Sequence, residues 1–289
     1  MRRCVLTGAT GLLGSQLVPL LRPDWQVHGV SRHRPVGVVP SGVIWHPLDL
    51  SRELDSTQLP PRADAVIYLA QSEHFREFPA RALEIFEVNT ANALHFLDYA
   101  RKSGVQSFIY ASSGGVYGGG DAGMSEEIAI PVRGDLGFYL STKLCSEIAV
   151  QNYADHFNVV ILRYFFVYGP LQRPNMLIPR LINRVQHGQP IELQGKDGLR
   201  INPIHVRDAA SATVRALTLG GSHTINIAGP EVLSMREVGL AIGRAVGRDP
   251  IFTVHQNASP KHLTGDIAKM RELLVPPQIV FADGVQTML

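Results

Sequence analysis

Short apolar runs alternate with longer amphipathic stretches through the first two-thirds of the chain. Apolar runs of this length predict strands, which we expect at residues 4–6, 26–30, 43–46, 65–70, 107–111 and 159–163. The amphipathic stretches predict helices at residues 11–21, about 80–102 and about 139–157. Because nearly continuous apolar strands alternate with helices, we expect an α/β fold, a Rossmann doubly wound parallel sheet with helices on both faces. Such a sheet binds ligands beyond the carboxyl ends of its strands.

The sequence pattern changes after residue 165, where prolines and glycines become frequent and the apolar runs shorten. This change predicts a smaller C-terminal substrate-binding lobe. A strand-like run at residues 223–227 could return to the main sheet, so we expect the two parts to interleave. We therefore assign residues 1–165, completed by about 203–228, to an NADP-binding Rossmann domain, and residues 166–289 mainly to the lobe.

Composition and charge argue against several classes of protein. Hydrophobic residues make up 45% of the chain and charged residues 18%, the balance of an ordinary soluble globular protein. The net charge of +2 comes without a long basic run, so nucleic acid is not an expected partner. No apolar run is long enough to span a bilayer and no signal-peptide cleavage site is visible, so we expect a cytoplasmic protein. Cys4 and Cys145 lie far apart and make no metal-ligand pattern.

A glycine-rich turn joins the first predicted strand to the first predicted helix. Gly8, Gly11 and Gly14 would let the chain turn tightly and bring its backbone close to a pyrophosphate. The helix N-terminus that follows offers N–H groups and a positive dipole end to the same anion. This strand–turn–helix context predicts dinucleotide binding rather than a glycine-rich turn without a ligand.

The end of the second strand bears on which dinucleotide binds. NAD-binding versions of this fold place an acidic residue there to bond the ribose 2′-hydroxyl, and this chain has Ser31 and Arg32 instead. Since a guanidinium can bond a 2′-phosphate, we favour NADP, while NAD stays possible. The alternative is that Arg32 is a solvated loop residue. Asp49, after the third strand, could accept a hydrogen bond from the adenine amino group or cap a following helix.

Tyr139 and Lys143 lie one turn apart at the start of a predicted helix. A tyrosine has an ordinary pKa of about 10, and a neighbouring ammonium lowers it, which makes the phenol useful for proton transfer at neutral pH. At the end of the preceding strand, Ser112 and Ser113 could each bond a substrate oxygen or cap the turn. Together with the glycine-rich turn, these residues predict a Ser–Tyr–Lys catalytic set.

With these motifs, the chain resembles an extended short-chain dehydrogenase/reductase of the NAD(P)-dependent epimerase/dehydratase family, whose members modify nucleotide sugars. The resemblance continues through segments at residues 162–170, 178–179, 195–200 and 203–208. It implies that Ser113 is the catalytic serine, that Tyr139 is the acid/base, and that Lys143 tunes the pKa of Tyr139 and binds the ribose. It also implies a homodimer joined by a four-helix bundle.

The resemblance further implies contacts with the cofactor and the substrate. The cofactor-binding residues are expected to be Gly8, Thr10, Gly11, Leu12, Leu13, Ser31, Arg32, Asp49, Leu50, Leu69, Ala70, Gln71, Asn89, Ala111, Ser112, Tyr139, Lys143, Tyr164, Phe165 and Val167. The substrate-binding residues are expected to be Ser113, Gly114, Phe166 and Arg200. No metal ligand is expected.

Three features depart from the pattern of the family. Its 4,6-dehydratases follow the catalytic hydroxyl with an acidic pair where this chain has Gly114 and Gly115, so dehydratase activity is disfavoured. Many members have asparagine where this chain has Phe166, and Arg200 sits one place from the usual phosphate-binding arginine. The last two differences concern the diphosphate of a nucleotide-sugar substrate.

Three functions stay open from the sequence. The first is a nucleotide-sugar epimerase that oxidises and re-reduces C4 by hydride transfer, with Tyr139 moving the proton and Ser113 holding the oxygen. The second is an NADPH-dependent reductase of a 4-keto-sugar or another carbonyl. The third is a non-catalytic NADP-binding protein, although such proteins usually lose the Tyr/Lys pair that this chain keeps. In the two enzymatic cases the partner is a small-molecule substrate, and no membrane is involved.

Overall fold

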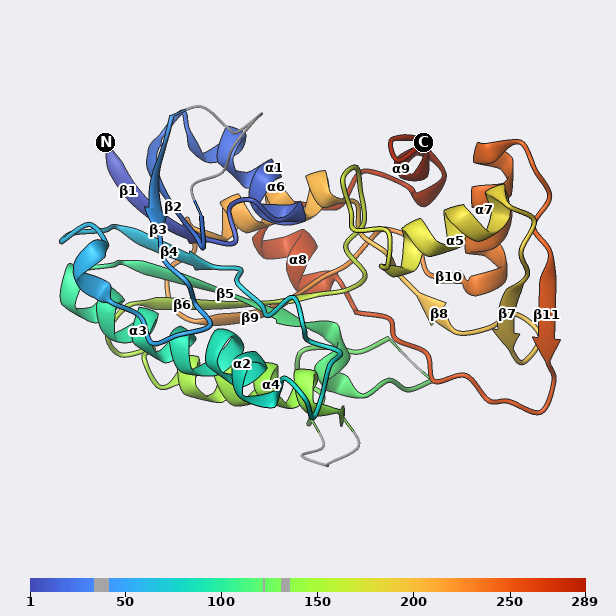
Figure 1. Ribbon diagram of the computed structural model, residues 1–289, viewed down its shortest axis with the longest axis horizontal. Helices are drawn as coiled ribbons and strands as arrows, with labels where there is room; N and C mark the ends of the chain where they lie inside the picture. Colours follow the sequence, from blue (N-terminus) through green and yellow to red (C-terminus); the bar gives the residue numbers. More distant parts are fainter. Residues whose placement is uncertain (34–41, 122, 131–135) are drawn as a thin grey trace. The chain divides into compact units, whose positions relative to one another are not determined.

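The computed structural model describes residues 1–33, 42–121, 123–130 and 136–289. Its main sheet has seven strands in the order β3-β2-β1-β4-β5-β6-β9 (Figure 1). The strands are β1 (Arg2–Thr7), β2 (Trp25–Ser31), β3 (Val43–Pro47), β4 (Ala65–Tyr68), β5 (Ser107–Ser113), β6 (Asn158–Tyr164) and β9 (His223–Ile227). The pairings from β3 to β5 are parallel, which confirms the predicted fold class. The strand order reverses between β1 and β4, the point at which such sheets bind ligands.

Helices cover both faces of this sheet. Figure 1 shows α1 (Leu12–Leu21) on one face, and α3 (Asn92–Ser103) and α4 (Phe138–Gln151) on the other. The helix predicted at residues 80–102 is found as α2 (Ala82–Phe86), a π-helical turn and α3. The π-helical turn is η2 (Glu87–Ala91), and two short 3-10 turns are η1 (Ser56–Gln58) and η3 (Gly114–Tyr117).

An apolar core fixes the strands whose carboxyl ends carry the candidate site. Phe96 of α3 meets Tyr68 of β4 edge to face, with 5.3 Å between ring centroids. Phe108 of β5 stacks on Phe157 at 6.0 Å. All four rings are buried, and burying a large apolar side chain contributes about 1.5–3 kcal/mol. The positions of β4 and β5 therefore rest on packing behind the site rather than on the site itself.

The helix predicted at residues 139–157 is shorter in the structure. α4 ends at Gln151, and the side-chain amide of Asn152 donates to the Ile148 carbonyl at 2.7 Å. Turns follow, in which Tyr153 stacks on Phe157 with 5.8 Å between centroids. These aromatic residues pack into the core from a turn rather than from a helix. Apolar periodicity alone does not distinguish the two, so the predicted helix extended too far.

Shorter elements form the second compact unit. Its helices are α5 (Leu177–Gln186), α7 (Met235–Val246), α8 (Ala268–Leu273) and α9 (Phe281–Gln286). Two small sheets pair β7 (Ile191–Gln194) with β11 (Phe252–His255) in parallel, and β8 (Arg200–Ile201) with β10 (Leu233–Ser234) antiparallel. At the start of α7, Ser234 and Glu237 form a capping box, because each side chain accepts from the other residue's backbone N–H.

The chain passes between the two compact units several times. The first unit comprises Met1–Val116, Val132–Arg163 and Ala210–Ile225, and the second comprises Tyr117–Pro131, Tyr164–Ala209 and Asn226–Leu289. The expected boundary at residue 165 lies beside the passage at residues 163–164. α6 (Val206–Ala216) begins in the second unit and ends in the first. Sequence periodicity gave no sign that residues 117–131 leave the first unit.

Among the described residues, no helix combines the length and the apolar character needed to cross a membrane. The same parts of the chain hold no group of three or more His, Cys, Asp or Glu side chains suited to a metal ion. Cys4 is buried and Cys145 is exposed, and both are free thiols.

Candidate active site

The glycine-rich turn follows β1 at the switch point of the sheet. The hydroxyl oxygen of Thr7, the last residue of β1, accepts hydrogen bonds from Leu69 N and Ala70 N, both at 3.0 Å. Gly8 then adopts a φ of +68°, a left-handed conformation that favours glycine. These contacts tie the end of β1 to the chain after β4, so the predicted residues of both segments line one edge.

The turn packs closely against α1 only because Gly14 has no side chain. A Cβ atom at Gly14 would lie 2.2 Å from the Gly8 carbonyl oxygen and 2.7 Å from the Ala9 Cα. Gly11, at the N-cap of α1, has no side chain to satisfy the first-turn N–H groups, which include those of Leu12 and Leu13. An uncapped helix N-terminus beside a glycine turn is the geometry that binds phosphate.

The residues predicted for the adenosine end make contacts of their own. Ser31 donates its hydroxyl to the His33 carbonyl at 2.7 Å, and Arg32 Nη1 lies 2.6 Å from Glu73 Oε1. Asp49 accepts from Ser51 N at 3.0 Å, so its carboxylate caps a turn rather than a helix. Burial opposes ionisation of Asp49, but the bonds from Ser51 and the charge of Arg32 together lower its pKa. A lowered pKa keeps this carboxylate an acceptor.

Lys143 is the most buried member of the predicted catalytic set. Its side chain is 2% exposed, and Nζ donates to the Ala111 carbonyl of β5 at 2.9 Å. The same nitrogen lies 5.1 Å from the centroid of the Tyr110 ring. Burial lowers the pKa of Lys143 to about 7, against the opposing effect of Glu147. The Lys143 side chain therefore changes between amine and ammonium near neutral pH.

Tyr139 lies one turn before Lys143 at the start of α4 and donates its phenol hydrogen to Gln71 Oε1 at 3.0 Å. Its ring also contacts Phe75, with 5.1 Å between centroids. Burial raises the pKa of Tyr139, which differs from the predicted lowering by Lys143. The reason is that the Lys143 ammonium is directed to the Ala111 carbonyl. In this structure the phenol is neutral.

The structure gives different surroundings to the two serines at the end of β5. Ser113 is half-buried, and its hydroxyl oxygen accepts from Gly115 N at 3.1 Å. A Cβ at Gly115 would lie 2.7 Å from Leu140 Cδ2 and 3.3 Å from Ser113 Oγ, which places Ser113 beside the residue after Tyr139. A side chain at Gly115 would require Leu140 to move. Ser112 is buried and donates to the Glu147 carboxylate.

Sequence reasoning missed a buried ion pair behind the catalytic helix. Glu147 Oε2 lies 2.6 Å from Arg163 Nη2 of β6, and Arg163 Nε lies 3.1 Å from Glu147 Oε1. Both side chains are almost fully buried. Glu147 follows Lys143 by one helical turn, so extending the same spacing along α4 would have found it. The carboxylate thereby joins β5, β6 and α4 beneath the candidate site.

This set of residues fits a dinucleotide, because it combines a tight glycine turn and an open helix N-terminus at the switch point with a buried amine at the end of β5. A model of the NAD dependent epimerase/dehydratase family matches residues 4–228. The chain belongs to this family. The family and the fold predicted from the sequence are both confirmed.

Several relatives in this epimerase/dehydratase family match nearly the whole chain. An uncharacterised UDP-glucose epimerase, YtcB, of Bacillus subtilis is 27% identical, over 98% of this chain and 95% of its own length. The structure of MoeE5 in complex with UDP-glucuronic acid and NAD superposes with a TM-score of 0.84, at 28% identity over 99% of this chain and 97% of that one. UDP-glucuronic acid 4-epimerase from Bacillus cereus, in complex with UDP-glucuronic acid and NAD, gives 0.84 at 26% identity and the same coverage.

Asn89, which is predicted to contact the cofactor, links two segments of the candidate site. It lies in the π-helical turn η2 and is fully buried. Its amide oxygen accepts from Ser72 N at 2.9 Å, and its amide nitrogen donates to Thr142 Oγ1 at 3.0 Å. Asn89 therefore holds the loop after β4 against α4, next to Lys143. Its contact with a cofactor stays a prediction.

Five of the predicted residues belong to the second compact unit. Phe165 is buried and donates its backbone N–H to the Ile227 carbonyl at 2.9 Å. Phe166 has a φ of +44°, an uncommon conformation for a bulky residue. Arg200 lies exposed in β8, where its backbone N–H donates to His262 Nδ1 at 3.0 Å. The contacts expected of these residues, and of Tyr164 and Val167, with cofactor or substrate stay predictions.

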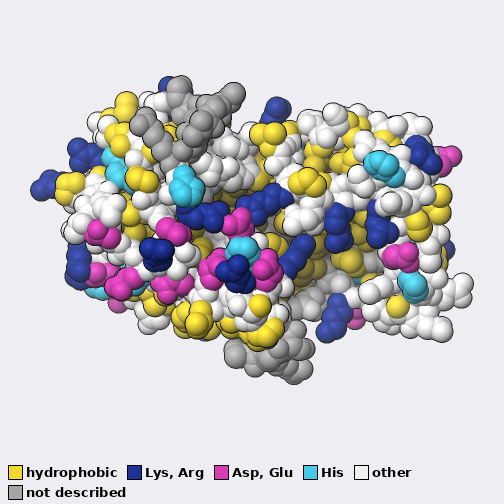
Figure 2. All heavy atoms as spheres, in the orientation of Figure 1, with side chains coloured by type: hydrophobic (Ala, Val, Ile, Leu, Met, Phe, Trp, Pro, Cys, Tyr) yellow, Lys and Arg dark blue, Asp and Glu magenta, His cyan; other side chains and the backbone are white. Residues whose placement is uncertain are grey.

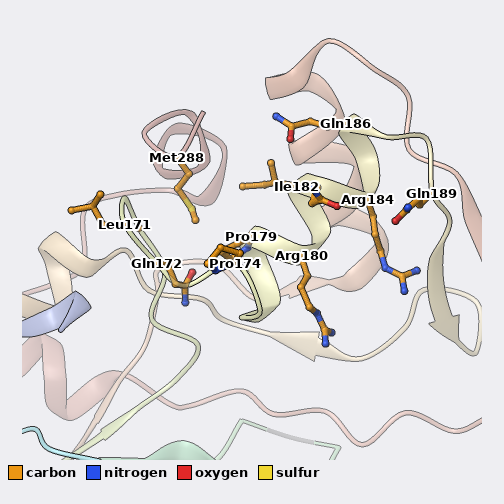
Figure 3. A pocket seen from close by; sticks show the side chains of 12 residues that line it. Leu171, Gln172, Pro174, Pro179, Arg180, Ile182, Arg184, Gln186, Gln189 and Met288 are labelled. Carbon is orange, nitrogen blue, oxygen red and sulfur yellow. The ribbon is translucent and has the colours of Figure 1, made fainter. Parts of the chain in front are cut away.

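The second unit also contains a cavity of about 670 Å³. Figure 3 shows side chains of α5 on one side of it, including Arg180 and Ile182, with Gln172 and Met288 on the other. Its lining among the described residues includes none of the residues predicted for the site.

Proposed function

We propose that this chain is an NAD(P)-dependent nucleotide-sugar epimerase that inverts C4 of the sugar by removing and returning hydride. The observation that carries the proposal is the grouping of Lys143, Tyr139 and Ser113 at the carboxyl end of β5, in the same unit as the phosphate-binding turn. The relatives that cover nearly the whole chain have names that specify UDP-glucose or UDP-glucuronic acid, which supports a UDP-sugar as the substrate.

The cofactor would lie along the edge formed after β1, β4 and β5. Gly8, Gly11 and Gly14 would admit its pyrophosphate, and Lys143 would bond its ribose. A bound nicotinamide supplies a reversible hydride acceptor. The NADP preference predicted from Arg32 is untested. In the structure the Arg32 guanidinium is paired with Glu73.

Tyr139 would act as the acid/base on the C4 hydroxyl. Its phenol now donates to Gln71, and a substrate hydroxyl would replace that partner. Because burial raises the pKa of Tyr139, the phenolate needs a nearby positive charge, which a protonated Lys143 can supply. Anionic phosphates of a bound dinucleotide favour that protonated form. Ser113 would hold the sugar oxygen while the ring turns over.

We also propose that the chain forms a homodimer through α2, α3 and α4. These helices expose large apolar side chains, among them Leu83 at 88%, Leu94 at 41% and Ile148 at 54%. Exposed apolar patches of this kind mark protein interfaces. The expected cytoplasmic location stays a prediction.

The test is incubation of the purified chain with NAD or NADP and a panel of UDP-, dTDP-, GDP- and ADP-sugars. Proton NMR of the anomeric signals would report the C4 epimer, and absorbance at 340 nm would report net change of the nicotinamide. Epimer formation without net absorbance change supports the proposal. Stoichiometric oxidation of NADPH by a 4-keto-sugar would identify a reductase instead. Cofactor binding without turnover of any sugar would favour the non-catalytic alternative.

A further inference from the structure

A carboxylate lies at the end of β2, where the sequence shows none. Arg32 follows β2 directly, and its guanidinium pairs with Glu73 of the loop after β4, at 2.6 Å. In Rossmann folds an acidic residue at the end of β2 bonds the ribose 2′-hydroxyl of NAD. Here Glu73, 41 positions further along the chain, brings a carboxylate to the guanidinium of Arg32. The charge at the end of β2 is therefore that of an ion pair rather than that of a free cation.

Further carboxylates surround the same guanidinium. The hydrogen bond that Arg32 donates to Glu73 is the main cause that raises the pKa of Arg32, and the charges of Asp49 and Glu84 add to it against partial burial. Figure 2 shows basic, acidic and histidine side chains crowded together on the left part of this face. A 2′-phosphate would add on the order of two negative charges to this group. A 2′-hydroxyl would add none.

The backbone holds Glu73 on both sides. Before it, Ser72 N donates to Asn89 Oδ1 at 2.9 Å, and after it, His74 N donates to Ser72 Oγ at 3.1 Å. The His74 ring is in turn bonded to Glu77 at 2.7 Å. Since Asn89 is fully buried, Glu73 projects from a fixed point. This fixed backbone keeps the Glu73 side chain within reach of Arg32.

We propose that Glu73 is a specificity-determining residue for the cofactor: it engages Arg32 and opposes a 2′-phosphate, so the chain takes NAD in preference to NADP. The assignment rests on the proposed function, since it concerns the dinucleotide of that same site. It reverses the preference drawn from Arg32 in the sequence. The physical reason is that Arg32 lacks the net positive field that a 2′-phosphate needs.

The test is the ratio of the dissociation constants for NAD⁺ and NADP⁺, measured by calorimetry on the full chain without sugar. Wild type should bind NAD⁺ about tenfold or more tightly than NADP⁺. Glu73→Gln should shift the ratio about tenfold or more toward NADP⁺, because Arg32 then faces the phosphate without its partner. Raising the salt concentration should reduce the wild-type discrimination, because exposed charges are screened.

Two further variants isolate the effect. Asp98→Asn likewise removes one exposed negative charge, but Asp98 pairs with Arg101 and Lys102 on α3 rather than on the loop of Glu73, so the ratio should not change. Adding Arg32→Ala to Glu73→Gln should abolish the gain in NADP⁺ affinity. Two results would overturn the role of Glu73 and leave the proposed function intact. One is a wild-type preference for NADP⁺, and the other is an unchanged ratio in Glu73→Gln with NAD⁺ still bound. A folded wild type that binds neither dinucleotide would overturn the proposed function as well.

Discussion

Ser112 donates its hydroxyl to Glu147, whose carboxylate lies one helical turn beyond Lys143 on α4. Ser112, which precedes the predicted catalytic Ser113, is therefore buried and bonded to a protein carboxylate. Glu147 also pairs with Arg163, so a buried carboxylate lies among two buried cations and a strand-end hydroxyl. Burying charges is costly unless they are paired, and this cluster keeps Lys143 in an otherwise apolar surrounding.

Glu147→Gln should destabilise the protein strongly. The amide oxygen can still accept from Ser112, but the buried Arg163 guanidinium loses its carboxylate partner. Removing one member of a buried pair costs about 3–5 kcal/mol. For a chain of this size the melting temperature should fall on the order of 10 °C, measured by circular dichroism.

The matched control for this change is Glu127→Gln. Glu127 also pairs with a cation, Lys269 at 2.6 Å, but its side chain is 80% exposed. This control should leave the melting temperature almost unchanged. Equal stability of the two variants would contradict a structural role for the buried pair.

Lys143→Met should abolish turnover while raising stability by a few degrees, because it removes a buried ammonium. The pKa of Lys143 is about 7 in the folded chain against 10.5 as its ordinary value. Between these values the unfolded chain holds the proton that the folded chain has released, so the contribution of Lys143 to stability rises with pH. The advantage of Lys143→Met should therefore be greatest below pH 7 and shrink toward pH 10.

Thermal melts of both proteins from pH 6 to 10 measure this difference. Lys102→Met serves as the control, since Lys102 is an exposed helix residue with a side chain 64% accessible. It should show no comparable trend. A constant gap between wild type and Lys143→Met across the range would refute the lowered pKa.

The positions of the main-sheet strands along the chain and the glycine turn were predictable, because they follow from patterns local in sequence. Gly8, Gly11 and Gly14 stand directly between a strand and a helix, and the structure shows why Gly14 admits no side chain. The spacing of Tyr139 and Lys143 likewise follows from helix periodicity. Such features need no information about distant segments.

Long-range pairings were not predictable from the same patterns. Glu73 meets Arg32 across 41 positions, and Tyr139 donates to Gln71 across 68. Both contacts depend on how the loop after β4 lies over its neighbours. The sequence therefore gave Arg32 and Tyr139 as candidate residues without the partners that set their charge and hydrogen bonding.

Gly14→Ala should remove dinucleotide binding. The new Cβ would lie 2.2 Å from the Gly8 carbonyl oxygen, so the turn must shift away from the geometry that admits a pyrophosphate. Calorimetry with NAD⁺ should show an affinity loss of about tenfold or more. Gly220→Ala is the control, because a Cβ there meets nothing within 4 Å among the described residues. Unaltered NAD⁺ affinity in Gly14→Ala would place the cofactor elsewhere.

Gln71→Leu should lower the pKa of Tyr139. A hydrogen bond from the phenol to Gln71 Oε1 favours the neutral form, and leucine removes that acceptor. Since the phenolate is the base in the proposed reaction, the rise of kcat/KM with pH should move to lower pH. The measurement is the pH profile of kcat/KM at saturating cofactor, because kcat/KM reports the enzyme without sugar, in which Gln71 holds the phenol.

Tyr139→Phe provides the reference for that profile. It keeps the ring contact with Phe75 but lacks the hydroxyl, so turnover should fall by about 100-fold or more at every pH while NAD⁺ binding is retained. A kcat/KM profile of Gln71→Leu that coincides with wild type would contradict a role of Gln71 in holding the phenol proton. A shift to higher pH would show instead that the Gln71 amide donates to the phenolate, which reverses its role from holding the proton to stabilising the base.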